Sequence, residues 1–407
     1  MIFTLVKNEL IKILKRSKTW IVFGLFAIAV VGVGFLSNYN AKQRADYQSP
    51  QGQIDNLNSQ LDMYNQQFKN SDSNGEAGNK EATEDANSYI EEIKGQIKVQ
   101  EERLTNAEDP NAWKTDLEQE KITLQAELDD KSIPDEYKTY QKPRIDEINM
   151  IIKEGVKPVE EWEFNAFNYV NGLLQIIGLI ILVSGIAVFM SDIVSGESTP
   201  PTLKFLLVQP ISRGKVILSK FIAVVITVVG MIAGLELAAF GIVGAIAGFS
   251  GGQMPKIIGT QYQWDYSNLS GSGEPILNRI VNSGVISTRA SAVFQSFGLE
   301  ILFIIACCAL IFLISSIFKS SMITMAISVI LSVASTMVCL MSSTVGKVAH
   351  LIFLNYGVTN IVIDGTVAQT FNNPNFSVGL GVVLMVGTII VSYVIAHIVF
   401  SKKDFLI

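Results

Sequence analysis

"SGESTPPTLKFLLVQPISRGKVILSK" (Ser195 to Lys220) lies between two long apolar runs, yet it is too polar for a membrane span and too apolar for an ordinary loop. Pro200 and Pro201 are expected to start a short helix, because proline has a fixed φ and lacks the N–H group that the first turn leaves unpaired. Pro210 then stops this helix after about two turns. A helix of this kind, followed by basic residues, predicts a surface that contacts another protein.

The apolar runs on either side are long enough to cross a membrane. The 407-residue chain is 49% hydrophobic and 17% charged, whereas soluble domains carry about 25% charged residues. A hydrocarbon core about 30 Å thick needs roughly 20 apolar residues in a helix. The segments that satisfy this rule are 20–37, 169–190, 221–249, 292–314, 322–341 and 377–400. The sequence therefore predicts an all-α membrane protein with six transmembrane helices.

Lysine and arginine near the span ends predict the orientation, because these residues accumulate on the cytoplasmic side. One set of connecting pieces holds 12 basic and 4 acidic residues; it consists of 1–19, 191–220, Lys319 and 401–407. By contrast, 39–165 holds 15 basic and 28 acidic residues. We therefore expect a multi-pass protein of the plasma membrane with both termini in the cytoplasm and three extracytoplasmic segments: 38–168, 250–291 and 342–376.

The 38–168 segment has the apolar spacing of paired helices. Ile54, Leu57, Leu61, Tyr64 and Phe68 follow one another at steps of three and four, which is a heptad seam. The period resumes over 90–104, 113–128 and 145–151. We expect two to four helices that form antiparallel coiled-coil hairpins. Either a solvated stalk or an element that binds a partner or gates the substrate fits this pattern.

Two further segments are expected to lie along the membrane surface. Residues 1–19 form an amphipathic helix, with apolar residues on one face and lysines on the other, and such a helix binds lipid headgroups. Residues 342–376 are apolar but interrupted by Gly357, Gly365 and Pro374, so we expect re-entrant or interfacial helices there.

The cysteines indicate packing rather than chemistry. Cys307, Cys308 and Cys339 all fall within predicted spans, so the outer domain contains no disulfide. An outer domain without disulfides suits the envelope of many Gram-positive bacteria. The cysteine spacing is not that of a metal site, and we expect none.

Two acidic residues stand within predicted spans, where charges are costly. Glu236 and Glu300 are expected in the outer half of the membrane, where they either line a substrate path, bind a cation or form an interhelical hydrogen bond. The pairs Gly230 with Gly234 and Gly244 with Gly248 permit close helix contact, either at a dimer seam or within the bundle.

The opening stretch resembles the signature of ABC-two type exporter permeases. The residues that match, with Leu206 on the same helix, are Glu197, Thr202, Leu203, Lys204, Pro210, Ser212, Arg213 and Lys220. Pro201 stands where the family usually has glycine. The amphipathic first helix, the six spans and the closing "FSKKD" (Phe400 to Asp404) are similar too, and 38–168 resembles the large insertion of one branch.

This resemblance implies a type V exporter fold in which the short helix is the coupling helix that docks on a separate cytoplasmic ABC ATPase. The sequence itself contains no G-x-x-x-x-G-K-[ST] motif, so we expect no enzymatic activity and no bound cofactor, with ATP and Mg²⁺ on the ATPase. Further expected partners are a second permease, identical or related, membrane lipid and an outer protein on the coiled coil. No nucleic-acid partner is expected.

Three functions remain open at this point. The first is the transmembrane subunit of an exporter for an amphipathic cargo such as a peptide, antibiotic or lipid. The second is a sodium-ion exporter. The third is a non-transporting anchor or sensor that presents the outer coiled coil and transmits force from a cytoplasmic ATPase.

Overall fold

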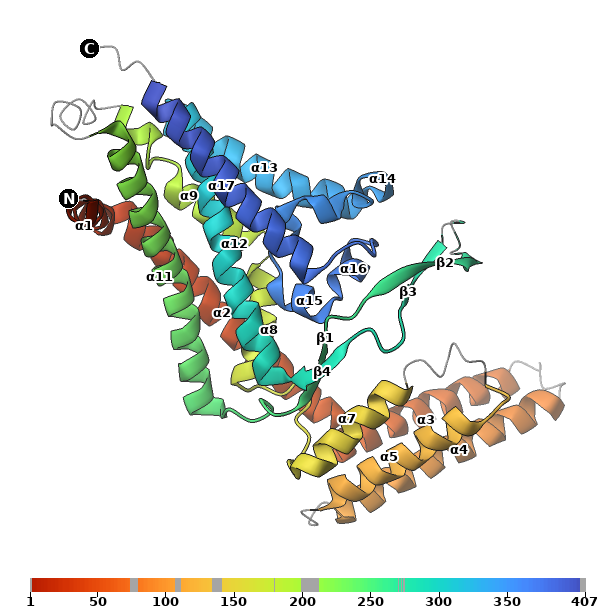
Figure 1. Cartoon of the computed structure of the whole chain (residues 1–407). Coiled ribbons are helices and arrows are strands. Elements are labelled where there is room, and N and C mark those ends of the chain that lie inside the picture. The colour runs from red at the N-terminus through yellow and green to blue at the C-terminus, as the bar shows by residue number, and fades with distance from the viewer. Residues whose placement is uncertain are drawn as a thin grey trace. The chain divides into compact units, whose positions relative to one another are not determined.

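The computed structural model describes residues 2–73, 80–106, 111–133, 141–178, 180–198, 212–269, 271, 273 and 275–402. The chain forms two compact units (Figure 1), Met1–Phe35 with Asn165–Ile407 as the first and Leu36–Phe164 as the second. Helix α2 (Ser17–Gln48) runs from the first unit into the second. Most of the described chain is helical.

Within the described residues, five helices are long and apolar enough to cross a membrane. These are α2, α11 (Arg213–Ala247), α12 (Arg289–Ile317), α13 (Ser321–Met341) and α17 (Val378–Lys402). A sixth crossing results if α8 (Ala166–Ile177) and α9 (Ile181–Met190), which are bent by 64° at a short break, count as one span. The chain is therefore a multi-pass membrane protein.

The break between α8 and α9 differs from the continuous 169–190 span expected from hydropathy. Gly178 ends α8, and a Cβ atom at this position would collide with the carbonyl oxygen of Gly357. The backbone of α8 approaches a distant segment so closely that only glycine fits. Hydropathy carries no information about such an approach, so the sequence pattern alone did not indicate the break.

Several helices also extend beyond the predicted spans. Helix α11 begins at Arg213 rather than at 221, and α2 continues to Gln48 rather than ending at 37. The apolar run defines the part of a helix that hydrocarbon surrounds, whereas the polar turns at its ends stay helical in water or in the headgroup layer. Arg213 and Lys220 thus belong to a helix, not to a loop.

Helix α12 is the centre of the first unit. It packs against α8, α9, α11, α13 and α17, and Thr288 caps its first turn by accepting a hydrogen bond from the Ser291 N–H. In the most apolar 18-residue stretch of each helix, 67% of the residues are buried in α12, but only 17% are buried in α2 and in α17. Helices α2 and α17 therefore lie at the periphery, with apolar faces that hydrocarbon or another subunit covers.

The 250–291 segment contains strands, so the all-α expectation is wrong in this detail. β1 (Pro255–Ile258) pairs antiparallel with β4 (Val285–Thr288), and β2 (Tyr262–Leu269) pairs antiparallel with β3 (Pro275–Arg279). The backbone of the β1 end bonds to the end of α15 (Thr359–Asp364), from Gly259 N to Ile363 O at 2.8 Å. Short strands bury little surface by themselves, and this attachment fixes them to the helical bundle.

The 342–376 segment forms a series of short helices, and whether they are re-entrant or interfacial stays a prediction. It consists of α14 (Ser343–Gly346), η2 (Ala349–Leu351), η3 (Phe353–Tyr356), α15 and α16 (Val367–Thr370). Tyr356, Phe371 and Phe376 form a cluster in which Phe376 lies 5.1 Å from Tyr356 and 5.2 Å from Phe371 between ring centroids. The aromatic cluster holds these short helices together.

The second unit consists of helix pairs. Helix α3 (Pro50–Ser73) packs against α4 (Lys80–Asn106), and α5 (Ala112–Asp129) packs against α7 (Gln141–Glu154). The pairing of α5 with α7 is antiparallel, because Glu120 bonds Arg144 whereas Glu127, farther along α5, bonds the earlier Gln141. Ile54, Ile93 and Ile148, all from the predicted seams, are buried. Whether these pairs are true coiled coils stays a prediction.

Candidate functional site at the root of the 199–211 segment

The central part of the predicted coupling helix lies outside the described residues. This applies to Thr202, Leu203, Lys204, Leu206 and Pro210, and to the side chain of Glu197. The structure does describe the two flanks of this segment, η1 (Ser195–Ser198) before it and α11 after it. Ser212 precedes α11 at its N-cap position, without a side-chain capping bond.

The flank before the segment is fixed to α12 by a buried hydroxyl. Ser315 Oγ on α12 accepts hydrogen bonds from the N–H groups of Val194 and Ser195, each at 3.2 Å. Both Ser315 and Ser195 are almost fully buried. Buried backbone donors need such acceptors, so this hydroxyl determines where the chain leaves the bundle.

The same flank is also tied to the corner between α1 (Ile2–Leu14) and α2. Asp192 accepts from Lys18 Nζ at 3.0 Å and from Arg16 Nη1 at 3.4 Å. Lys18 also donates to Ser191 Oγ at 2.9 Å. All three charged side chains are partly exposed, so these ion pairs contribute geometry more than stability.

The flank after the segment is fixed by two other contacts. Arg213 Nη1 donates to the carbonyl oxygen of Ser401 on α17 at 3.2 Å. Lys220 Nζ lies 2.9 Å from Glu9 Oε1 on α1, and the Lys220 side chain is only 1% exposed. A charge that is buried so completely requires a partner of opposite sign.

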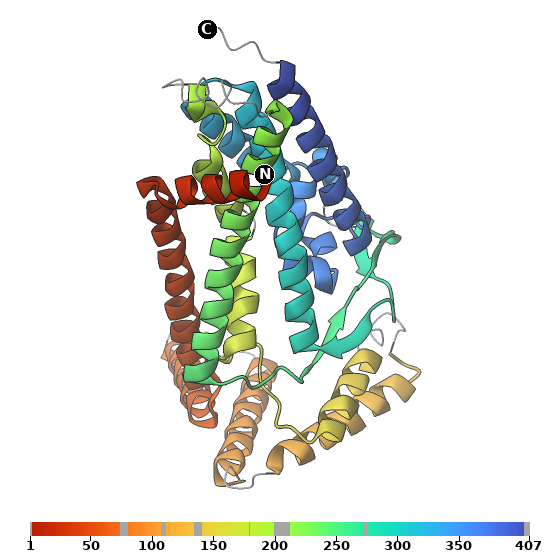
Figure 2. The ribbon, with the colours of Figure 1, turned by 60° about the vertical axis from the view of Figure 1, so that its left-hand side comes forward.

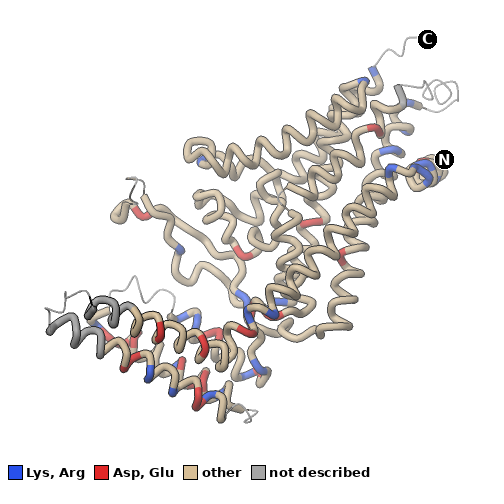
Figure 3. The backbone as a smooth tube through the Cα atoms, turned by 180° about the vertical axis from the view of Figure 1, so that it is seen from behind, with Lys and Arg blue, Asp and Glu red and all other residues tan. Residues whose placement is uncertain are grey.

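Helix α1 and the corner that follows it therefore contact the two flanks of the segment. Glu9 binds the α11 side, while the corner that follows α1 binds the Asp192 side. Figure 2 shows α1 lying across α11. The basic residues of α1, of the start of α11 and of the end of α17 gather at this same end (Figure 3). The two flanks of residues 199–211 are thus attached to α1, α11 and α12.

The structure brings together the two intramembrane acids that the sequence singled out. Glu236 on α11 and Glu300 on α12 are 1% and 2% exposed and interact with each other. Neither carboxyl oxygen of Glu236 has a hydrogen bond of ordinary geometry in the described part of the chain. Within the same residues, no three His, Cys, Asp or Glu side chains cluster as a protein metal site requires.

Comparison with known proteins identifies the family. A family model described as ABC-2 family transporter protein matches residues 3–405. The chain belongs to this family. ABC-2 family membrane proteins generally work with a separate ATPase subunit. Searches among the curated proteins and among the solved structures gave no match.

The glycines of this ABC-2 family protein have two different roles. A Cβ atom at Gly230 or Gly234 would meet no atom of the described chain within 4 Å, so this pair faces open space. By contrast, Gly244 lies against the ring of its own neighbour Phe249, and Gly248 ends α11 with a φ of +86°. The second pair therefore lies at the turn that ends α11, and its role as a helix-packing seam stays a prediction.

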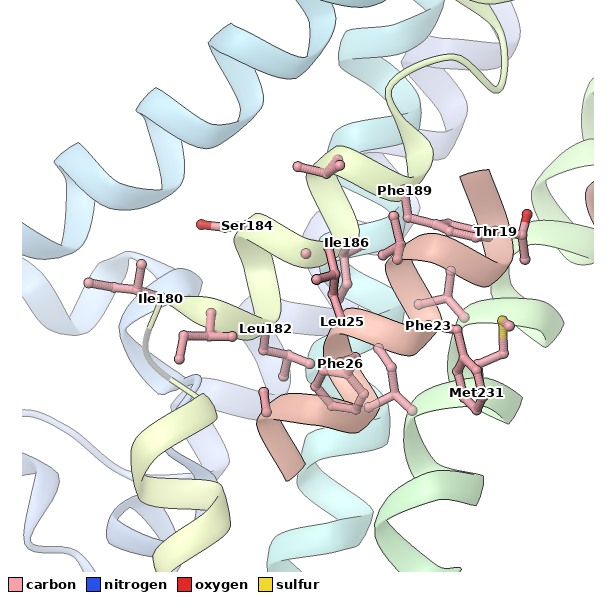
Figure 4. Close-up of a pocket in the computed structure, with 17 residues that line it drawn as sticks. Thr19, Phe23, Leu25, Phe26, Ile180, Leu182, Ser184, Ile186, Phe189 and Met231 are labelled. Atoms are coloured by element: carbon pink, nitrogen blue, oxygen red, sulfur yellow. The ribbon is translucent and has the colours of Figure 1, made fainter. Parts of the chain in front are cut away.

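A cavity of about 400 Å³ lies between α2, α9 and α11 of this ABC-2 family protein (Figure 4). Its lining is apolar except for the hydroxyls of Thr19 and Ser184, and neither Glu236 nor Glu300 takes part. No motif in the sequence indicates this cavity, because helices that are distant in the sequence enclose it.

Proposed function

We propose that this protein is the transmembrane subunit of an ATP-driven exporter, in which residues 199–211 dock on a cytoplasmic ABC ATPase. The observation that carries the proposal is the attachment of both flanks of this segment to α1, α11 and α12 at the basic end of the bundle. A segment that is rooted in three helices transmits a displacement to all of them. A free loop would not.

The orientation of the protein follows from charge. The flanks of the segment lie among Lys and Arg residues, and the positive-inside tendency places that end in the cytoplasm, with both chain termini. We infer that the cell is Gram-positive from the outer unit, which has no cysteine. The ATPase and its Mg²⁺–ATP are then on the same side as residues 199–211.

In the proposed mechanism the ATPase hydrolyses ATP, and this chain converts the resulting movement into a rearrangement of its helices. ATP binding closes the ATPase dimer and moves residues 199–211; Ser315 and Lys220 pass the motion to α12, α11 and α1. Hydrolysis on the ATPase resets the arrangement. Six crossings are half of a transport pathway, so a second permease, identical or related, completes it, and the open face at Gly230 and Gly234 is a candidate contact for that subunit.

An amphipathic peptide, antibiotic or lipid is the proposed cargo. The peripheral apolar faces of α2 and α17 allow such a molecule to approach from the bilayer, and the helix pairs of the second unit offer an outer surface for the cargo or for a protein partner. A carrier for a small hydrophilic solute would instead require a polar path.

A pull-down of the tagged full chain from its native membranes tests the docking. The variant is Glu197→Ala combined with Leu206→Ala, and Lys319→Ala, at the connection between α12 and α13, is the matched control. Arg213 stays intact because its bond to Ser401 supports the bundle. We expect an ATPase with a P-loop to co-purify with the wild type and the control, but not with the double variant.

The proposal is wrong if no such ATPase accompanies the wild type in several mild detergents. If the complex forms, vesicles that contain it separate a transporter from a force-transmitting anchor. A transporter moves a labelled amphipathic peptide across the vesicle membrane as ATP is hydrolysed. An anchor hydrolyses ATP while the peptide stays where it was.

The Glu236–Glu300 pair favours sodium as a second candidate cargo. Two adjacent carboxyls in an apolar setting repel each other when both are ionised, and a cation between them removes that repulsion. Vesicles loaded with sodium or with choline distinguish this candidate, because only a sodium exporter changes its sodium content when ATP is added.

A further inference from the structure

The cavity between α2, α9 and α11 is suited to an apolar occupant. A buried water molecule needs two to four polar partners, whereas this lining offers two hydroxyl groups among seventeen residues. One of them, Thr19 Oγ1, already donates to the carbonyl oxygen of Ile13 at 2.7 Å. Water is thus a poor filling for the cavity.

The dimensions of the cavity match one membrane leaflet. Its lining on α2 extends from Thr19 to Ala29, and its lining on α9 and the residue before it extends from Ile180 to Phe189. Ten residue steps at 1.5 Å rise about 15 Å, which is half of a hydrocarbon core about 30 Å thick. The cavity lies beside α2, whose apolar window is only 17% buried, and so next to the bilayer.

One end of the cavity is basic. Thr19 and Phe189 lie at that end (Figure 4), and the residues next to them along the chain carry the Arg16, Lys18 and Asp192 ion pairs. Lys15, which is exposed, adds a further positive charge at the same corner. Arg16 and Lys18 share the single carboxylate of Asp192, and Lys15 precedes them in the chain, so these four side chains carry a net charge of about +2. The guanidinium also has more donors than its contact with Asp192 uses.

We propose that this cavity holds an acyl chain of an anionic phospholipid from the leaflet on the basic side, with the phosphate headgroup at the corner formed by Lys15, Arg16 and Lys18. The apolar lining accepts the chain, and the unbalanced charge selects the headgroup. The lipid would fill the space that the α8–α9 break opens and hold α2 against α9. This inference does not depend on the ATPase.

Photochemical labelling of the full chain in vesicles tests the proposal. The vesicles contain equal amounts of phosphatidylglycerol and phosphatidylcholine, and a small fraction of one or the other carries a diazirine on an acyl chain. After illumination, the labelled peptides are mapped by mass spectrometry. We expect the phosphatidylglycerol probe to label lining residues of α2 and α9, and the phosphatidylcholine probe to label them much less.

Two glycines provide a variant that fills the cavity and a matched control. A Cβ atom at Gly185, which lines the cavity, would meet no atom within 4 Å, so Gly185→Leu fills the space without a backbone clash. Gly24 on α2 is equally open but does not line the cavity. Labelling of the lining should be lost in Gly185→Leu and kept in Gly24→Leu. Lys15→Gln should reduce the phosphatidylglycerol signal toward that of phosphatidylcholine.

Three results would overturn the proposal. Equal labelling by the two probes in the wild type removes the headgroup selectivity, and this comparison requires no variant to fold. Unchanged labelling in Gly185→Leu, in protein that elutes as the wild type does on size exclusion, places the lipid elsewhere. Displacement of the probe by an excess of amphipathic peptide assigns the cavity to cargo.

Discussion

Lys220 on α11 and Glu9 on α1 form an ion pair of 2.9 Å that is almost completely removed from solvent, with the two side chains 1% and 13% exposed. Residues 211 positions apart in the sequence are thereby joined next to the 199–211 segment. Because a buried charge without its partner is strongly unfavourable, this contact fixes the position of α1.

Replacement of Glu9 by glutamine should destabilise the protein. Breaking a buried pair by removing one partner costs about 3 kcal/mol or more, so Glu9→Gln should clearly lower the melting temperature of the purified chain. Glu91→Gln is the matched control, since the pair of Glu91 with Lys94 is exposed and should contribute almost nothing. The double exchange Glu9→Lys with Lys220→Glu should recover most of the loss. Failure of the exchange to recover any of it would mean that the pair is not the cause.

The hydroxyl of Ser315 should contribute more to the free energy of unfolding than the hydroxyl of an ordinary serine in a helix. Ser315→Ala leaves the Val194 and Ser195 N–H groups without this acceptor, and a buried unsatisfied donor costs about 1–3 kcal/mol. Ser296→Ala on the same helix removes only a bond to its own backbone, Ala292 O, and should be nearly neutral. Unfolding by denaturant measures both. Equal effects of the two substitutions would contradict the role of Ser315.

Replacement of Glu236 by glutamine should change the stability of the bundle little in sodium-free buffer. The two side chains already interact with each other, and the amide in Glu236→Gln can donate a hydrogen bond to Glu300 in place of the carboxyl group. If the pair binds sodium, the wild type should melt at a higher temperature in sodium chloride than in choline chloride. Glu236→Gln should lose that difference. A wild type that is indifferent to the cation would leave the sodium candidate without support.

The β2–β3 hairpin should be insensitive to pH until strongly acidic conditions. Hydrogen bonds from the Ser267 hydroxyl and N–H, and from Asn268, lower the pKa of Asp265 to about 2, below a usual value of about 3.9. A lowered pKa contributes stability above the unfolded value, and this contribution is lost as the pH falls from about 3.9 through about 2.

Fluorescence of Trp264, in a chain whose other three tryptophans are phenylalanine, reports on this hairpin. The signal should be constant from neutral pH to about 4 and change below it, and Asp265→Asn should abolish the change. A transition near neutral pH would show that Asp265 does not control the hairpin.

Strands β2 and β3 have a sequence pattern that is recognisable without the structure. "YQWDYSNL" (Tyr262 to Leu269) and "PILNR" (Pro275 to Arg279) surround a stretch rich in glycine and serine, which is typical of a hairpin. Hydropathy alone predicts a loop at 250–291, because this segment lies between two strong apolar runs. The α8–α9 break is different, because it lies beside the close approach of Gly178 to Gly357, and no local pattern predicts such an approach.

Local composition and period predict the apolar segments, the basic end of the bundle and the helix pairs of the second unit, because hydrocarbon thickness and helix geometry convert these properties directly into structure. They do not predict that Glu9 meets Lys220, that Glu236 meets Glu300 or that α2, α9 and α11 enclose a cavity. Each of these depends on how helices distant in sequence are rotated and packed, and that arrangement results from the balance of many contacts rather than from any single segment.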